Sequence, residues 1–190
     1  EGVEDGILKG LYRLPNKQKQ PKKPKAHIQL WGSGSILEKC VLAAQKTLIE
    51  DYKIATDVWS VTSYQQLYRD ARACERRNRF VEKKDREISY VQSTMSSSKG
   101  PIVAVSDSVQ ELPAMLRGFL DKPIVPLGTN GLGRSDTREA LRRHFEIDEA
   151  AVVIAALSQL ADEGSIQWKV VKDAMERFDW PEDKPDPATL

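Results

Sequence analysis

The chain has 190 residues, of which 40% are hydrophobic and 30% are charged, with a formal net charge of +1. This composition is typical of one globular domain with appendages and excludes both a disordered chain and a membrane-embedded one. The small net charge gives no bias toward nucleic acid or anionic membranes, and no apolar run approaches the roughly 20 residues that span a bilayer. We therefore expect neither nucleic acid nor a membrane among its partners.

Residues 1–26 are not typical of the start of a compact unit. Their apolar side chains lie between glycines, where they are able to dock against a neighbour, and residues 15–25 contain only Pro, Lys, Gln and Asn. Such a run is typical of a solvated linker or hairpin tip, and no aromatic residue interleaves its lysines as in a single-strand nucleic-acid site. The chain begins with Glu, so we expect a piece of a longer polypeptide. We interpret 1–26 as an arm from a preceding domain, 27–180 as a single α/β domain and 181–190 as a C-terminal tail.

From His27 onward, short apolar runs alternate with amphipathic stretches. The apolar runs predict strands at 28–31, 55–61, 102–105 and 124–127. Helices are predicted after Ser35, after Ser63, around Met115 to Phe119, and over 137–145, 149–163 and 168–178. This alternation predicts a doubly wound, mostly parallel sheet with helices on both faces.

Capping residues indicate where several of these helices begin. Three pairs have capping-box spacing, and Asp148 precedes another helix; the pairs are Ser35 with Glu38, Ser63 with Gln66, and Asp136 with Glu139. The helix after Ser63 is expected to continue into a stretch where basic and acidic residues from Glu75 to Glu87 are mixed. Mixed signs predict a solvated, salt-bridged surface rather than an anion site.

The stretch from Gly128 to Glu139 combines a strand exit, a glycine turn and a helix start. It is not a phosphate loop, because no Gly-Lys-Ser/Thr follows, nor the dinucleotide fingerprint, because Asp136 stands where the third small residue belongs. We expect an interdomain turn formed by Gly128, Gly131, Gly133, Arg134, Ser135, Asp136 and Arg138. Arg138 opposes the helix dipole, so we expect it to have a carboxylate partner elsewhere. The alternative is a regulatory module that binds a small anion here or at Gly32–Ser35.

The cysteines and histidines predict no chemistry of their own. Cys40 and Cys74 lie on apolar helix faces, which predicts buried thiols rather than a redox pair. His27 and His144 lack metal-ligand spacing. We predict no catalytic, cofactor-binding or metal-binding residue in this chain.

Several blocks, in order, resemble the C-terminal domain of the homodimeric, transketolase-like pyruvate dehydrogenase component. The blocks are Glu1–Ile7, Gly10–Tyr12, His27–Leu37, Asp57–Tyr64, Arg69–Asp70, Cys74–Arg76, Gly128–Arg138, Arg142–Asp148 and Val152–Ala161. The resemblance covers nearly the whole chain and implies a sheet of about five strands, one of them antiparallel. Asn130 and Leu132 depart from the family pattern, which usually has Asp and Phe there, so the choice of 2-oxo acid stays open.

The resemblance also implies a parent enzyme and its partners. The parent would be a cytoplasmic oxidoreductase that decarboxylates a 2-oxo acid and transfers the acyl group to a lipoyl carrier, toward acetyl-CoA formation. Thiamine diphosphate and a divalent metal such as Mg²⁺ would bind between the two preceding domains, across a homodimer interface. The expected partners are those domains, the dimer partner and the lipoyl acyltransferase component. The present chain would scaffold the parent and catalyse nothing alone.

Overall fold

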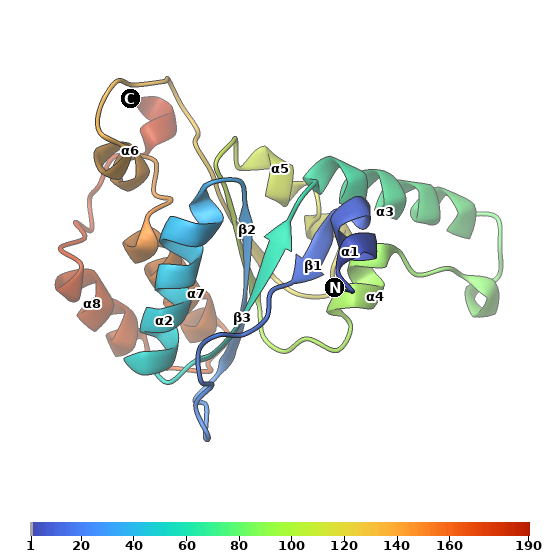
Figure 1. Ribbon diagram of the computed structural model, residues 1–190, viewed down its shortest axis with the longest axis horizontal. Coiled ribbons are helices and arrows are strands. Elements are labelled where there is room, and N and C mark those ends of the chain that lie inside the picture. The colour runs from blue at the N-terminus through green and yellow to red at the C-terminus, as the bar shows by residue number, and fades with distance from the viewer. Residues whose placement is uncertain (1) are drawn as a thin grey trace.

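The computed structural model describes residues 2–190 as a five-stranded sheet between two layers of helices (Figure 1). The strands are β1 (Leu11–Arg13), β2 (His27–Ser33), β3 (Ala55–Val61), β4 (Ile102–Ser106) and β5 (Ile124–Leu127). Their order across the sheet is β1-β3-β2-β4-β5. All neighbouring pairs are parallel except β1 with β3. The predicted α/β class, with a mostly parallel sheet and one antiparallel strand, is confirmed.

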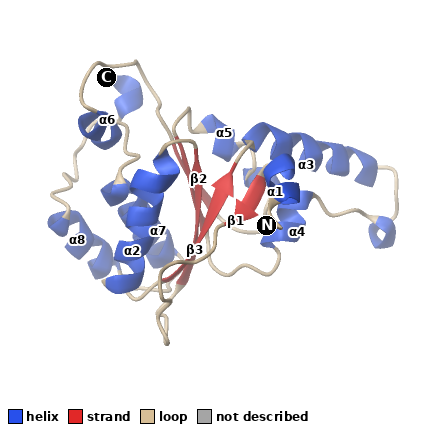
Figure 2. Ribbon diagram, in the orientation of Figure 1, coloured by secondary structure: helices blue, strands red, loops and turns tan. Residues whose placement is uncertain are grey.

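One face of the sheet is covered by α2 (Leu42–Glu50) and α7 (Glu149–Asp162), with α8 (Trp168–Arg177) outside them (Figure 1). These helices form a core with Leu30, Val58 and Val103 of the central strands. A π-helical turn, Leu37–Val41, leads into α2. Figure 2 shows this helical layer beside the sheet.

The opposite face carries α1 (Glu4–Lys9), α3 (Tyr64–Asn78), α4 (Tyr90–Met95) and α5 (Glu111–Ala114). Trp31, Leu67 and Leu116 belong to the core on this side. Leu30 and Trp31 enter different cores because successive strand residues point to opposite faces. The single helix predicted around Met115 to Phe119 is instead α5 followed by a 3₁₀ turn, Arg117–Phe119. Gly118 lowers helix propensity there.

The N-terminal arm adds an edge strand to the sheet. β1 pairs with β3 so that Leu11 lies opposite Val61, and Leu11 is fully buried. Gln20 pins the lysine-rich loop to β3, because its side chain donates to the Thr56 carbonyl at 2.8 Å and accepts from the Thr56 N–H at 3.0 Å. The loop therefore lies against the sheet and is not a free linker. That residues 1–26 lead from a preceding domain stays a prediction.

Helix α3 ends at Asn78, earlier than predicted. Residues 79–88, which we call the hook, project away from the sheet, include a 3₁₀ turn at Lys83–Asp85 and are exposed at every position (Figure 1). Glu75 pairs with Arg72 and Arg79, and two further ion pairs are Arg77–Glu87 and Lys84–Glu82. These pairs confirm the predicted salt-bridged surface.

The C-terminal helices match their predicted ranges to within one residue at each end: α6 (Arg138–His144), α7 and α8. A last 3₁₀ turn, Pro187–Thr189, closes the chain. Two predicted N-caps are confirmed, since Ser63 accepts from the Gln66 N–H and Asp148 accepts from the Ala151 N–H. Within residues 2–190, no helix combines the length and apolar character that crossing a membrane requires.

Candidate functional site

Both glycine turns identified in the sequence lie at the carboxyl edge of the parallel strands. Gly34 follows β2, Asp107 follows β4 and Gly128 follows β5. A hollow of about 270 Å³ opens at this edge, lined by residues that include Ser33, Tyr64 and Asp107. Open α/β sheets place ligand sites at such edges, so the local geometry decides whether this one is free to bind.

The first turn is already filled by a carboxylate of the chain itself. Asp107 Oδ2 accepts the Ser35 N–H at 3.0 Å, and a Cβ built on Gly34, whose φ is +67°, would lie 1.9 Å from that oxygen. Asp107 therefore occupies the place where an anion would sit. It also changes the helix start: Ser35 is not an N-cap, and the helix begins with the π-helical turn at Leu37.

The second turn is held from its base by side-chain contacts. Gly128 packs against the backbone of Ser108 and Gln110, where a Cβ would lie 2.4 Å from the Gln110 nitrogen. Asn130 Oδ1 accepts the Gln110 N–H at 2.8 Å, and Asn130 Nδ2 donates to Glu111 at 3.2 Å. The Asn130 amide therefore both accepts and donates, which an ionised carboxylate at this position could not do.

The remainder of the turn faces solvent. Residues 131–140 are exposed throughout, and Leu132 is 76% exposed. The predicted N-cap Asp136 is wrong by one residue: Thr137 caps α6 by accepting the Ala140 N–H at 3.2 Å, while Asp136 accepts the Thr137 N–H at 2.6 Å. Asp136 does not cap the helix, because α6 begins at Arg138 and the N-cap position is therefore Thr137. A capping-box partner lies three residues after the N-cap. With Thr137 as N-cap that position is Ala140, so Glu139 is not a capping-box partner.

The seven predicted residues of this turn are thus distributed over its length rather than gathered around one point. Gly128 is buried at its base, and Gly131, with φ +102°, packs on the backbone of Pro187. A Cβ placed on Gly133 would have no atom within 4 Å, apart from those of its chain neighbours. Within residues 2–190, Arg134 and Arg138 form no ion pair, and Ser135 is exposed. The carboxylate expected for Arg138 is therefore not in this part of the chain.

The small-anion reading is not supported by this geometry. Carboxylates of Asp107 and Asp136 receive the N–H groups at the two turns. Helix α6 has seven residues and its N-terminal N–H is capped by Thr137. Among residues 2–190, no group of three or more His, Cys, Asp or Glu side chains is arranged to hold a metal ion.

Tyr64, Cys40 and His144 are among the side chains whose pKa values are shifted by their surroundings. Burial raises the pKa of the Tyr64 hydroxyl, which lies beneath the hollow and has no hydrogen-bond partner among residues 2–190. Burial also raises the pKa of the Cys40 thiol, so Cys40 stays protonated at neutral pH. Burial together with the positive charges of Arg134 and Lys184 lowers the pKa of His144.

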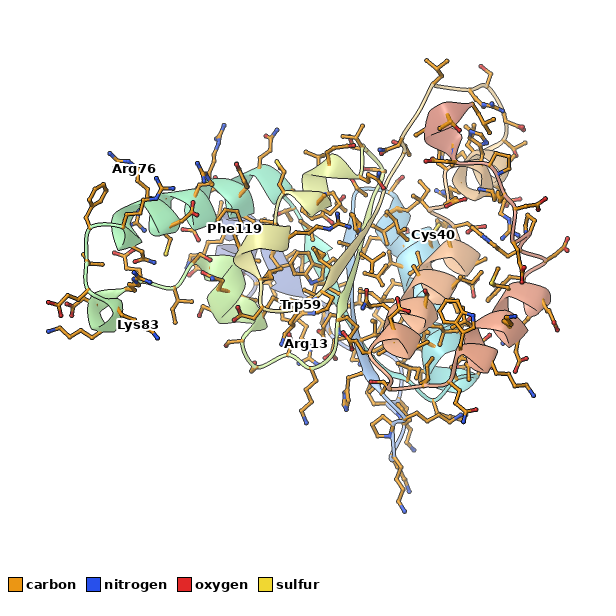
Figure 3. All side chains as sticks on the ribbon, turned by 180° about the vertical axis from the view of Figure 1, so that it is seen from behind. Arg13, Cys40, Trp59, Arg76, Lys83 and Phe119 are labelled. Carbon is orange, nitrogen blue, oxygen red and sulfur yellow. The ribbon has the colours of Figure 1, made fainter. Side chains whose placement is uncertain are left out.

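The two cysteines are free, buried thiols, as the sequence predicts. Cys40 belongs to the core beneath α2 and α7 (Figure 3), whereas Cys74 lies on α3 across the sheet. Two thiols on opposite faces of a sheet cannot form a disulfide bond unless the domain unfolds.

The C-terminal tail is fastened beside the turn by contacts that sequence reasoning missed. Arg143 donates to the carbonyls of Phe178 and Asp179 at 2.9 and 2.7 Å, and its guanidinium lies 4.4 Å from the Trp180 ring centroid. Lys184 donates to Glu146 at 2.8 Å and to the His144 carbonyl at 3.0 Å. No local sequence pattern predicts these hydrogen bonds, because they join residues that are far apart in the chain.

Replacing Arg143 with alanine is expected to lower the free energy of unfolding by about 0.5–1.5 kcal/mol, because the half-buried Phe178 carbonyl and the exposed Asp179 carbonyl lose a charged donor. The tail should also become more sensitive to protease. Urea denaturation and limited proteolysis measure both effects. The control is Arg142→Ala, the preceding residue, whose side chain forms no ion pair within residues 2–190. Equal effects of the two variants would contradict a fastening role for Arg143.

Comparisons with known proteins agree with the fold. Residues 10–148 match the family described as Transketolase-like TK C-terminal domain. The chain is 41% identical over 179 residues to the pyruvate dehydrogenase E1 component of Pseudomonas aeruginosa, which covers 94% of this chain and 20% of that protein. It is 41% identical over 188 residues to the pyruvate dehydrogenase E1 component of Escherichia coli K12, which covers 98% of this chain and 20% of that protein.

A solved transketolase from Campylobacter jejuni is also similar, with a TM-score of 0.45 and 20% identity over 80% of this chain and 19% of that one. The chain spans about a fifth of the length of the curated relatives it matches. The family match extends from β1 to the start of α7 and includes the whole sheet. The chain belongs to the family of transketolase-like C-terminal domains.

Proposed function

We propose that this chain is the C-terminal domain of a pyruvate dehydrogenase E1 component. The observation that carries the proposal is the 41% identity to the Escherichia coli protein of that name, maintained over 98% of the chain. The parent would decarboxylate a 2-oxo acid, pyruvate, and transfer the acyl group to a lipoyl carrier. Thiamine diphosphate with Mg²⁺ would supply the carbanion chemistry of that reaction when bound.

The residues of this chain do not fit that cofactor. A diphosphate needs free N–H groups, but the turns at Gly34 and Asp136 present theirs to carboxylates of the chain itself. A divalent metal needs grouped oxygen ligands, and residues 2–190 hold no such group. We therefore assign no catalytic step to this chain and place cofactor binding in the preceding domains.

The work of the chain is structural, and the glycine turn is its contact surface. Leu132 is 76% exposed, and Arg134 and Arg138 have no ion pair within residues 2–190. An exposed apolar side chain beside two uncompensated guanidiniums fits a surface that is covered in the assembled parent. The partners would be the preceding domains and the second subunit of a homodimer, with the lipoyl acyltransferase component as the next protein in a cytoplasmic complex.

A chimera tests the proposal. This chain replaces the matching fifth of the Escherichia coli relative, and CO₂ release from pyruvate is measured together with the mass in solution. The chimera is expected to be dimeric and active, whereas the isolated chain should release no CO₂. A folded, dimeric chimera without activity would contradict the proposal.

A charge reversal tests the role of the turn within the same chimera. Arg138→Glu is expected to lower activity about tenfold or more, because an interdomain ion pair becomes a repulsion worth at least about 1.4 kcal/mol. Lys172→Glu is the control, since Lys172 is exposed on the outer helix α8. If the two reversals have the same effect, Arg138 does not meet a sister domain.

A further inference from the structure

The hook is clamped at its base, so its shape is set before any partner arrives. The Asn78 side chain donates to the Glu87 carbonyl and accepts the Glu87 N–H, each at 2.9 Å. Arg77 adds two hydrogen bonds to the Glu87 carboxylate, at 2.8 and 2.6 Å. A surface segment held in this way loses little conformational entropy when it binds.

Apolar side chains are exposed along the hook. Phe80 is 76% exposed, Ile88 is 71% exposed and Val81 is 41% exposed. Single exposed apolar residues are ordinary, but three within one short projecting segment form a patch of the kind found at interaction sites.

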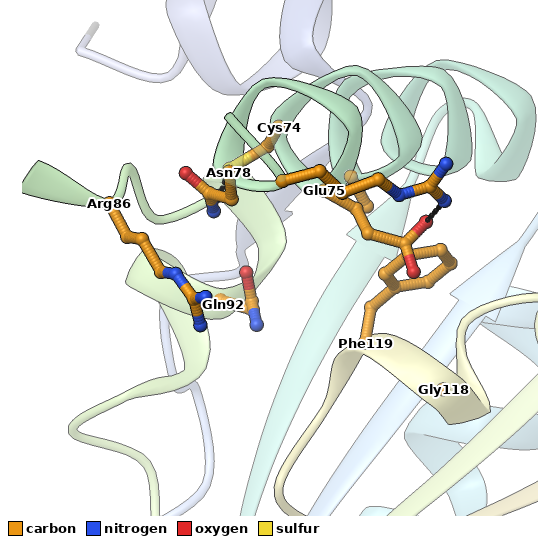
Figure 4. A pocket seen from close by; sticks show the side chains of 9 residues that line it. Cys74, Glu75, Asn78, Arg86, Gln92, Gly118 and Phe119 are labelled. Atoms are coloured by element: carbon orange, nitrogen blue, oxygen red, sulfur yellow. Dashed lines mark hydrogen bonds and ion pairs between the residues drawn. The ribbon is translucent and has the colours of Figure 1, made fainter. Parts of the chain in front are cut away.

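A groove runs beneath the hook. One hollow, of about 340 Å³, is lined by Arg79, Arg86 and Phe119 among others, and Figure 4 shows Arg86 and Gln92 on one side of it with Glu75 and Phe119 on the other. A second hollow, of about 280 Å³, is lined by residues that include Ile88, Met95 and Leu120. Gln92 borders both, so the two hollows lie side by side, and we call them together the groove, with a polar end and an apolar end.

The charges around the groove are unbalanced in one direction. The carboxylates of Glu75, Glu82 and Glu87 are each paired with a basic side chain. Within residues 2–190, Arg76, Lys83 and Arg86 form no ion pair. Figure 3 shows Arg76 and Lys83 at the end of the molecule remote from Cys40 and the helices around it. Asp85 of the hook and Asp121 of the second hollow also form no ion pair within residues 2–190, but the unpaired basic side chains around the groove, which include Lys122, outnumber them.

We propose that the hook and its groove dock an acidic protein segment that carries an apolar side chain, supplied by a polypeptide other than this one. The apolar anchor would enter the hollow beside Ile88, and its flanking carboxylates would face Arg86 and the tip of the hook. The paired carboxylates along the hook disfavour a polyanion such as nucleic acid, because they would repel closely spaced phosphates.

The hook is remote from the glycine turn, although α1, where the chain begins, lies on the same face of the sheet as the hook. The hook extends from the end of α3, whereas the glycine turn lies beside α6 and the C-terminus on the other side of the sheet (Figure 1). A partner on the hook would leave the glycine turn free for the preceding domains.

Fluorescence anisotropy with defined probes tests the proposal on the whole chain. The first probe is a labelled peptide of twelve residues with a central Leu-Phe pair flanked by Glu, and the second has Lys at every Glu position. The acidic probe should bind and the basic probe should not. Phe80→Ser and Arg86→Glu should each weaken binding of the acidic probe tenfold or more.

Matched variants control for general effects on the surface. Leu8→Ser removes an apolar side chain that is 77% exposed, close to the 76% of Phe80, and Lys172→Glu reverses an exposed charge on α8. Both should leave binding of the acidic probe unchanged, and thermal melting should show every variant folded. No binding of the acidic probe, equal binding of the basic probe, or equal effects of hook and control variants would overturn the proposal.

Two further outcomes would also overturn it by assigning the hook to another occupant. If the chain is a dimer in solution and Phe80→Ser makes it a monomer, the hook binds a second copy. If Phe80→Ser lowers CO₂ release by the chimera in the absence of any other protein, the hook meets a sister domain. An active chimera whose CO₂ release does not change with Phe80→Ser would support the proposed function of the chain without deciding whether the hook binds a partner, so the two proposals are tested separately.

Discussion

Replacing Gly34 with alanine should lower the free energy of unfolding by about 2–5 kcal/mol, the sum of backbone strain and overpacking. Gly34 has a φ of +67°, which a side chain disfavours, and a Cβ there would lie 1.9 Å from Asp107 Oδ2. Moving the carboxylate away would also break its 3.0 Å hydrogen bond with the Ser35 N–H. Urea denaturation followed by circular dichroism measures the loss.

Gly133→Ala is the matched control, in the other glycine turn. A Cβ on Gly133 has nothing within 4 Å, so the change should stay within about 0.5 kcal/mol, as for ordinary surface substitutions. A small effect of Gly34→Ala would mean that Asp107 does not fill the first turn, and would reopen that turn to ligands.

Leu11→Ala should cost about 2–5 kcal/mol, as expected for a large-to-small change at a fully buried position. Leu11 is 0% exposed in β1 and belongs, with Trp59 and Tyr64, to the core between the sheet and α3. The loss would also leave the edge of β3 less well covered. The same denaturation assay applies, and hydrogen exchange of the Val61 amide reports on the edge directly.

Leu8→Ala makes the same chemical change three residues earlier, where the side chain is 77% exposed. Its effect should stay within about 0.5 kcal/mol. If Leu11→Ala and Leu8→Ala are equally mild, the arm does not contribute to the stability of the domain, and the pairing of β1 with β3 is wrong.

The strands and the later helices were predictable because their signals are local. Apolar runs such as Ile102 to Val105 need no distant information, and the caps Ser63 and Asp148 act on N–H groups three residues away. Ser35 is not a cap: its own N–H donates to Asp107, which follows β4, and the helix begins with the π-helical turn at Leu37. Local spacing cannot reveal a competitor that is 72 residues away.

Two other elements depended on partners that the sequence does not place. β1 has three residues and no alternating pattern long enough to identify it; it forms because the edge of β3 is available. α3 ends at Asn78 because that side chain pairs with the backbone of Glu87 rather than lying on a continuing helix.

The candidate site was predictable as a turn and a helix start, but not as a surface. Glycine spacing and the family resemblance identified Gly128 to Arg138, whereas the support from Asn130 and the packing of Pro187 on Gly131 required the three-dimensional structure. The absence of a local signal for the hook has the same origin, since its clamp joins residues nine positions apart.

The return of the last residues to the glycine turn bears on how the protein should be handled. Pro187 packs on Gly131, and Leu190 ends the chain close by with 48% of its surface exposed. If the glycine turn meets a sister domain as we propose, a purification tag or fluorescent protein fused after Leu190 should hinder that contact, because Pro187 and Ala188 lie against Gly131. A dye attached at Lys169, exposed on the outer face of the molecule, would report on assembly without that obstruction.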